Sequence, residues 1–135
     1  WVLAGVEDRK LLRLSQMREL EGTEGGGLCK QLTLSKLRMP GEMEERDRRR
    51  MGYSDTDING HVNNTRYADI VCDAVPWEVW DTAQIRDFTI SYHREVPRGE
   101  CFTLRRARPA EDTFYFDGER EGKSAFEAQL IFKHL

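Results

Sequence analysis

One helix decides the fold of this chain, and residues 63–75 encode it: Asn63-Asn64-Thr65-Arg66-Tyr67-Ala68-Asp69-Ile70-Val71-Cys72-Asp73-Ala74-Val75. Apolar side chains recur along this stretch at helical spacing, at Tyr67, Ile70, Val71, Ala74 and Val75. Asn63 or Asn64 can serve as the N-cap, and Pro76 ends the run. The sequence therefore predicts one helix with one apolar face.

Three stretches after the helix alternate apolar and polar residues as strands do. They are predicted at residues 85–96, with Phe88, Ile90 and Tyr92 on one face; at residues 101–108; and at residues 113–133, with Phe126, Ala128, Leu130 and Phe132 on one face. Of two hairpin signals in the last stretch, we favour Glu121-Gly122, because Asp117-Gly118 leaves only a stub of strand before it. Short turns exclude parallel crossovers, so we expect an α+β fold with the helix across one face of an antiparallel sheet.

The residues before residue 50 carry weaker signals. Residues 1–14 predict two short strands around the polar Glu7-Asp8-Arg9, and residues 15–50 read as a connector with one helical turn at residues 16–20. The connector ends in a basic cluster at residues 46–50, which we interpret as the solvated entrance to a strand. Because the chain opens on Trp1, we expect it to be a piece of a longer protein.

Composition narrows the classes of function. The 135 residues carry a formal net charge of −3, which argues against a general nucleic-acid surface. The longest apolar runs are far shorter than the ~20 residues of a membrane span, and no signal sequence opens the chain, so we expect a cytoplasmic protein without a membrane partner. Cys29, Cys72 and Cys101 have neither the number nor the spacing of a disulfide framework or a thiolate zinc site, so we expect no metal and no cofactor.

The densest polar cluster, residues 53–64, lies directly before the helix, and three interpretations compete for it. It resembles the opening of a calcium-binding loop, but the twelfth position, which needs a bidentate Glu, is Arg66. The glycosylation signal at residues 63–65 we interpret as chance. The third interpretation is catalysis: if residues 57–61 are extended, Asp57, Asn59 and His61 project to one side, beside a helix N-terminus that favours an oxyanion. The alternative, that Asp57 and Asn59 only shape the turn and cap the helix, stays open on spacing alone.

The same residues carry a resemblance. The run from Asp57 to Tyr67, followed by Tyr92-His93-Arg94-Glu95, resembles the catalytic domain of acyl-ACP thioesterases, which have the hotdog fold. The resemblance implies a hotdog domain at residues 46–135, and the end of a preceding domain with its connector at residues 1–45. It implies an enzyme that hydrolyses the thioester of fatty acyl-acyl carrier protein in fatty acid biosynthesis.

The resemblance also assigns roles. Glu95 activates the attacking water, while Asp57, Asn59 and His61 position the thioester and stabilise its oxyanion. The division of duties between Asp57 and Glu95 stays open. By alternation alone Glu95 faces solvent, opposite Phe88, Ile90 and Tyr92. Many plant relatives have Cys after this Glu, but the position is Val96 here, so a thiol nucleophile at that point is excluded. Cys72 and Cys101 are expected to pack as small apolar groups.

The expected partners follow from this assignment. An acidic acyl carrier protein would be guided by the cluster of Arg46, Arg48, Arg49 and Arg50 or, less well, by Arg105, Arg106 and Arg108. An uncovered apolar face and edge predict a homodimer or pairing with an N-terminal hotdog domain. The rival functions are a hotdog acyl-CoA thioesterase, a non-catalytic module that binds acyl thioesters, and an inactive half of a larger enzyme.

Overall fold

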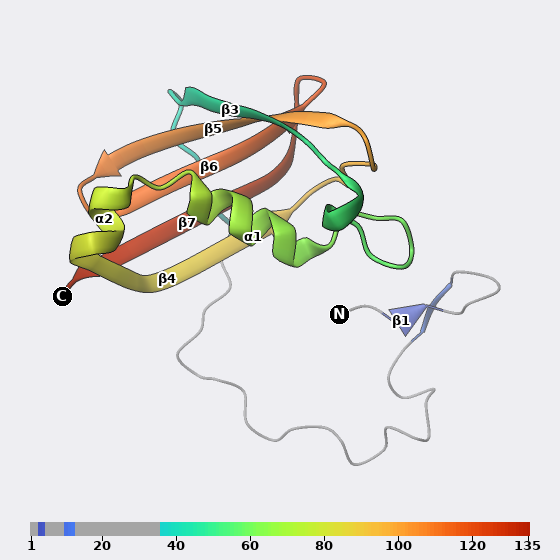
Figure 1. Cartoon of the computed structure of the whole chain (residues 1–135), viewed down its shortest axis with the longest axis horizontal. Helices are drawn as coiled ribbons and strands as arrows, with labels where there is room; N and C mark the ends of the chain where they lie inside the picture. Colours follow the sequence, from blue (N-terminus) through green and yellow to red (C-terminus); the bar gives the residue numbers. More distant parts are fainter. Residues whose placement is uncertain (1–2, 5–9, 13–35) are drawn as a thin grey trace, which may run out of the picture. The chain divides into compact units, whose positions relative to one another are not determined.

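A five-stranded antiparallel sheet, in the order β3-β5-β6-β7-β4, is the largest element of the structure (Figure 1). The computed structural model describes residues 3–4, 10–12 and 36–135. The described elements are, in chain order, β1 (Leu3–Ala4), β2 (Leu11–Leu12), β3 (Glu44–Arg50), a 3-10 turn (Tyr53–Asp55), α1 (Asn64–Asp73), α2 (Trp77–Thr82), β4 (Ala83–Tyr92), β5 (Cys101–Ala110), β6 (Thr113–Arg120) and β7 (Lys123–His134).

The chain divides into two units, residues 1–35 and residues 36–135. In the first unit β1 and β2 pair antiparallel, with Leu3 opposite Leu12, which confirms the two short strands expected within residues 1–14. The helical turn expected at residues 16–20 and Cys29 lie outside the described residues. The assignment of residues 1–45 to a preceding domain and a connector stays a prediction.

In the second unit, one face of the sheet is apolar and α1 lies across it (Figure 1). Alternate residues of β5, β6 and β7 are buried on that face, as expected for strands that pack on one side only. The helix contributes Tyr67, Ile70 and Val71 to the same core. The alternating apolar residues that these three strands bury are Phe102, Leu104, Phe114, Phe116, Phe126, Ala128, Leu130 and Phe132. This arrangement confirms the predicted α+β fold with a central helix.

The first helix is shorter than its apolar pattern, and a second helix follows it. α1 ends at Asp73 with Ala74 as its C-cap, two residues before the predicted end. Pro76 is the N-cap of α2, and its missing N–H and fixed φ separate the two helices. The sequence analysis missed α2, because a helix of six residues with Val79 as its one buried position shows no periodicity.

Strand β4 ends earlier than predicted. It pairs with β7 up to Tyr92, opposite Phe126. The backbone N–H groups of His93 and Arg94 then both donate to the carbonyl of Ala125, at 2.8 and 3.0 Å, and the chain leaves the ladder. The predicted extension of the strand to Val96 is therefore wrong. Glu95 is exposed, as expected, but strand alternation is not the reason, because the residue lies beyond the end of β4.

The hairpin between β6 and β7 turns at Glu121 and Gly122, as predicted. Their φ values of 53° and 71° are both positive, as a tight hairpin turn requires. Gly118, the competing turn signal, lies inside β6 instead. A Cβ atom at this position would overlap the ring of Phe126. The glycine therefore makes room for an aromatic ring rather than for a turn.

We expect Gly118→Ala to lower the free energy of unfolding by about 1–3 kcal/mol, because the new methyl group must displace a buried ring in a close-packed core. Urea unfolding followed by circular dichroism measures this. Gly41→Ala is the matched control, since no atom lies within 4 Å of a Cβ there. Equal stability of the two variants would contradict this account of Gly118.

Candidate active site

Residues 56–62 form a tight loop directly before α1. Thr56 and Val62 pair as an isolated antiparallel bridge, and the N–H of Asp57 donates to the carbonyl of His61 at 2.8 Å. Gly60 has a φ of 78°, in the left-handed region, and its N–H donates to the carbonyl of Asp57 at 3.0 Å. Residues 57–61 are therefore not extended, the condition under which alternation would align Asp57, Asn59 and His61, because the chain reverses at Gly60.

The carboxylate of Asp57 holds this loop together. Its Oδ1 accepts hydrogen bonds from the backbone N–H groups of Asn59, at 2.9 Å, and His61, at 3.2 Å. The Asn59 side-chain amide lies 3.5 Å from Oδ2. Desolvation raises the pKa of Asp57, but the two backbone N–H groups and the Asn59 amide outweigh it and lower the pKa below its ordinary value. Asp57 and Asn59 therefore do shape the turn, which is one part of the alternative interpretation that spacing alone left open.

His61 and Glu95 meet across two separate segments. The Nε2 atom of His61 lies 3.5 Å from Oε1 of Glu95, and the two side chains are 61% and 47% exposed. The backbone supports this contact, because His61 pairs with Pro97 as an isolated bridge. The structure therefore brings the predicted imidazole and carboxylate together, and ties the His61 backbone to Asp57.

The N-terminus of α1 lies next to this loop, and its cap is Asn63. The Asn63 side-chain oxygen accepts from the N–H of Thr65 at 3.0 Å, and its backbone carbonyl accepts from the N–H of Arg66 at 2.9 Å. Among the described residues, none accepts the backbone N–H of Asn64. One helix N–H is thus free to donate to a developing oxyanion.

Two tyrosines that the sequence analysis assigned to apolar faces also place their hydroxyl groups here. The Tyr67 hydroxyl accepts the N–H of Val96 at 3.4 Å, and the Tyr92 hydroxyl donates to the carbonyl of Asn64 at 3.0 Å. Burial raises the pKa of both phenols, so they stay protonated donors at neutral pH. Their apolar spacing predicts the rings correctly and gives no signal for the hydroxyl groups.

Asp55 is a site residue that the sequence analysis missed. Its side chain is buried, and its carboxylate accepts from the N–H of Gly52 at 2.7 Å and from Nε of Arg66 at 3.2 Å, with Arg49 at 4.0 Å. Burial raises the pKa of Asp55, but the Gly52 hydrogen bond and then the two arginines outweigh it and lower the pKa. Arg66, which excluded the calcium loop, is thus an ion-pair partner of the residue that fixes the loop's start.

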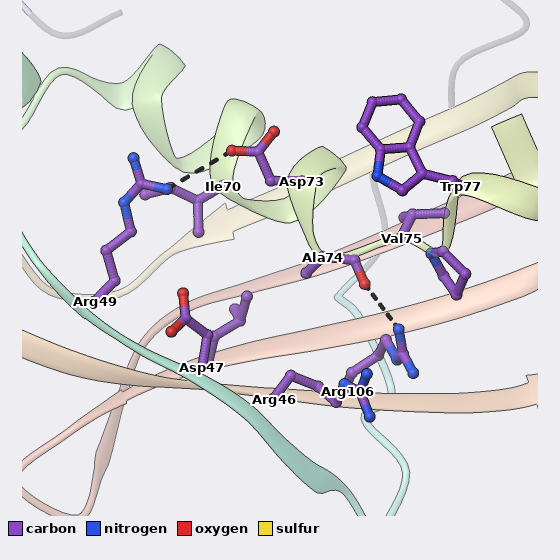
Figure 2. A pocket seen from close by; sticks show the side chains of 11 residues that line it. Arg46, Asp47, Arg49, Ile70, Asp73, Ala74, Val75, Trp77 and Arg106 are labelled. Carbon is purple, nitrogen blue, oxygen red and sulfur yellow. Dashed lines mark hydrogen bonds and ion pairs between the residues drawn. The ribbon is translucent and has the colours of Figure 1, made fainter.

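A separate cleft of about 390 Å³ lies at the other end of α1, between this helix, β3 and β5. Figure 2 shows Arg49 directed toward Asp73, at 3.7 Å, and Arg106 toward the carbonyl of Ala74, at 2.8 Å. These contacts occupy two arginine side chains that line the cleft, and the cleft lies away from His61 and Glu95.

In the part of the chain that the structure describes, no set of three His, Cys, Asp or Glu side chains is arranged to hold a metal ion. Nor does any described helix combine the length and apolar character of a membrane span.

The sheet wrapped on one helix is the hotdog architecture, as in two thioesterase structures of low sequence identity. The 12:0-ACP thioesterase from Umbellularia californica has a TM-score of 0.77 at 16% identity, over 98% of this chain and 53% of that one. An acyl-ACP thioesterase from Bacteroides thetaiotaomicron has a TM-score of 0.66 at 23% identity, over 96% of this chain and 53% of that one. These likenesses establish the fold.

Sequence comparison gives the family. The acyl-ACP thioesterase C-terminal domain matches residues 40–134, so the chain belongs to this family. A dodecanoyl-[acyl-carrier-protein] hydrolase of Cinnamomum camphora is 44% identical over 43 residues, which are 32% of this chain and 11% of that protein. An oleoyl-acyl carrier protein thioesterase of Arabidopsis thaliana is 40% identical over 47 residues, 35% of this chain and 13% of that protein. The matched segments thus span a small part of these relatives.

We expect Asp55→Asn to lower the free energy of unfolding at pH 7 by about 1–3 kcal/mol, because it weakens charge-assisted hydrogen bonds at a buried site. The lowered pKa of Asp55 gives the pH dependence. Its stabilisation is complete above the unfolded pKa of about 3.9 and is lost as pH falls through the lower folded pKa. The stability gap between wild type and variant should therefore be constant from pH 7 to 5 and close below pH ~4.

Urea unfolding at each pH measures this gap. Asp69→Asn is the matched control, since Asp69 pairs with the same Arg66 at 2.7 Å but is 54% exposed. An exposed pair of this kind contributes little to stability. A gap that persists unchanged at pH 3 would contradict the assignment.

Proposed function

We propose that this chain hydrolyses the thioester bond of fatty acyl-acyl carrier protein and releases the free fatty acid, in fatty acid biosynthesis. The single observation that supports it most is the contact of 3.5 Å between His61 and Glu95, beside the α1 N-terminus of an acyl-ACP thioesterase C-terminal domain. The matched plant relatives are named as hydrolases of acyl-carrier-protein thioesters, which supports the same substrate class.

The surroundings of the two carboxylates favour different roles for them. Asp57 already accepts two backbone N–H groups, and its pKa is lowered, so it is a poor proton acceptor. Glu95 is half exposed, with His61 as its ion-pair partner in the described structure. We therefore assign the general base to Glu95, and to Asp57 the task of holding the loop that presents Asn59 and His61.

The reaction then needs one water and no other reactant. The oxygen of the water attacks the thioester carbon while Glu95 takes a proton from that water, and the carbonyl oxygen becomes an oxyanion. The free N–H of Asn64 and the side chains of Asn59 and His61 are the candidate donors to that oxyanion. When the carbonyl re-forms, the carbon–sulfur bond breaks, and the leaving thiolate takes up the proton. General-base assistance of this kind contributes ~10²–10⁴ in rate.

Docking of an acidic carrier has less support than the reaction. Of the first basic cluster, Arg49 points inward to Asp55 and Asp73, so it is not part of a steering surface. Arg46 pairs with Glu44, and Arg50 donates to the carbonyl of Gly99 at 2.9 Å. Arg48 has neither kind of contact among the described residues, and we propose it as the docking cation. In the second cluster, Arg105 pairs with Asp117 and Glu119, which leaves it poorly placed for a carrier. The cytoplasmic location stays a prediction.

The proposal is tested by assaying the chain, with and without its natural N-terminal extension, on one acyl group carried by acyl carrier protein and by coenzyme A. We expect hydrolysis of both, with the higher kcat/KM for the carrier-bound form. The opposite preference would favour the acyl-CoA thioesterase. Tight retention of either thioester with no thiol release would favour the non-catalytic module, and activity only with the extension would favour the inactive half.

Four variants separate the roles of the carboxylates. We expect Glu95→Gln and Glu95→Ala both to lower kcat by about 10²–10⁴, because neither can take a proton. Asp57→Ala should also abolish turnover, whereas Asp57→Asn should keep much of it, because an amide oxygen can still accept the loop N–H groups. Thiol release gives kcat, and the melting temperature shows that each variant is folded. Glu100→Gln, an exposed glutamate on the same connection, is the control; wild-type turnover in Glu95→Gln would remove the assignment.

We also propose that edge strand β4 pairs with a second hotdog unit, either a second copy of this chain or an N-terminal domain. Among the described strands, β4 has β7 as its one neighbour, and Ile85, Phe88 and Tyr92 on it are 37%, 37% and 44% exposed. A ten-residue edge strand that exposes three large apolar side chains is a ready pairing surface. In Figure 1 this strand borders the sheet on the side away from β3.

For the chain alone, sedimentation should show a dimer at micromolar concentration. Phe88→Arg should shift it to a monomer, because a charge on the pairing surface opposes association. Lys133→Arg, at the exposed end of β7, is the control. A wild-type chain that sediments as a monomer would contradict the self-pairing.

A further inference from the structure

The segment that carries Glu95 depends on contacts made by its neighbours. Glu95 itself has His61 as its partner, at 3.5 Å, and the two side chains are 47% and 61% exposed. An exposed pair of this kind is too weak to fix a loop. What fixes the segment is the bend at its start, where the N–H groups of His93 and Arg94 share the carbonyl of Ala125. A regular ladder gives each carbonyl one such donor, so this sharing directs the chain out of the sheet.

The side chain at that bend is tied down on the outer face of the sheet. Nε2 of His93 lies 3.0 Å from Oε2 of Glu127, and the two side chains are 35% and 19% exposed. Glu127 projects from the face opposite the core, because its neighbours Phe126 and Ala128 are both buried on the core face. This contact is shorter and less exposed than the one between His61 and Glu95, so water screens it less.

The charged groups near Glu127 are either acidic or paired with other residues, so His93 is its ion-pair partner. Asp117, buried, stands directly opposite Glu127 on β6. Asp117 is paired with Arg105 on β5, which also pairs with Glu119. Within residues 36–135, the side chain of Glu127 has its ion pair with His93 alone. A carboxylate next to a second carboxylate therefore holds His93 in place, and His93 holds the bend.

The other end of the segment is anchored on the core side. The Tyr67 hydroxyl accepts the N–H of Val96, and Pro97 pairs with His61. Tyr67 is buried, with its ring 4.8 Å from that of Phe126. The anchor before Glu95 is therefore His93, on the outer face of the sheet. The anchors after Glu95 are Val96 and Pro97, which contact Tyr67 and His61.

We propose that His93 and Glu127 are positioning residues, whose contact on the outer face keeps Glu95 beside His61. The inference rests on the proposed function, in which Glu95 is the general base. Neither residue touches the thioester, and both act through the bend at His93. Loss of the contact lets the bend relax and moves the carboxylate of Glu95 away from the water that it deprotonates.

We expect Glu127→Ala to lower kcat about tenfold or more, with KM for the acyl thioester within about twofold, because misplacement of a catalytic group by an ångström affects the chemical step. Glu127→Gln, which still accepts a hydrogen bond from His93, should restore most of the rate. His93→Ala is a second variant, which removes the donor from the other side of the contact and should lower kcat as Glu127→Ala does. Glu119→Gln is the matched control, since it breaks an ion pair on the same face without touching residues 93–97.

The positions of the His61 ring signals in the NMR spectrum provide a readout that needs no turnover. Glu95→Ala defines how they move when the contact with Glu95 is lost, and Glu127→Ala and His93→Ala should move them in the same direction, while Glu119→Gln should not. Unmoved His61 signals in both variants would overturn the proposal, whether or not kcat falls. A wild-type chain without hydrolysis would refute the proposed function, and the ring signals would still decide this inference.

Discussion

The buried carboxylate of Asp55 is the interaction on which the site depends. It accepts the N–H of Gly52 after the end of β3, and it binds Arg66 on the first turn of α1. The backbone carbonyl of Asp55 accepts the N–H of Asn63, the cap of the same helix, at 2.8 Å. Both ends of the loop that carries Asp57 and His61 are therefore tied to one residue. A buried carboxylate tolerates this position only because donors surround it.

The sequence predicts the fold well because burial imposes periodicity. Phe126, Ala128, Leu130 and Phe132 alternate along β7, and the apolar face of α1 recurs at helical spacing, so both elements could be read from the chain. Changes in chain direction that depend on single backbone groups leave no such periodic pattern in the sequence. The bend at His93 and the reversal at Gly60 each change the direction of a side chain without changing the apolar pattern.

The candidate site shows the same division. Residue types and the resemblance identify Asp57, Asn59, His61 and Glu95, and the structure brings His61 and Glu95 into contact. The extended arrangement of residues 57–61 is wrong, because it counts alternation through a glycine with positive φ. Asp55 was missed for another reason: its charged partners Arg66 and Arg49 lie on two other elements, α1 and β3, and no periodic pattern links them to it.

Gly118 links the interior of the sheet to this chemistry. The absence of a side chain there admits the ring of Phe126, and that ring supports Tyr67, whose hydroxyl holds the segment after Glu95. A larger residue in the middle of β6 would push along this row of aromatic rings toward the reacting groups. One missing methyl group in the interior thus keeps two segments that are far apart in the sequence in register with each other.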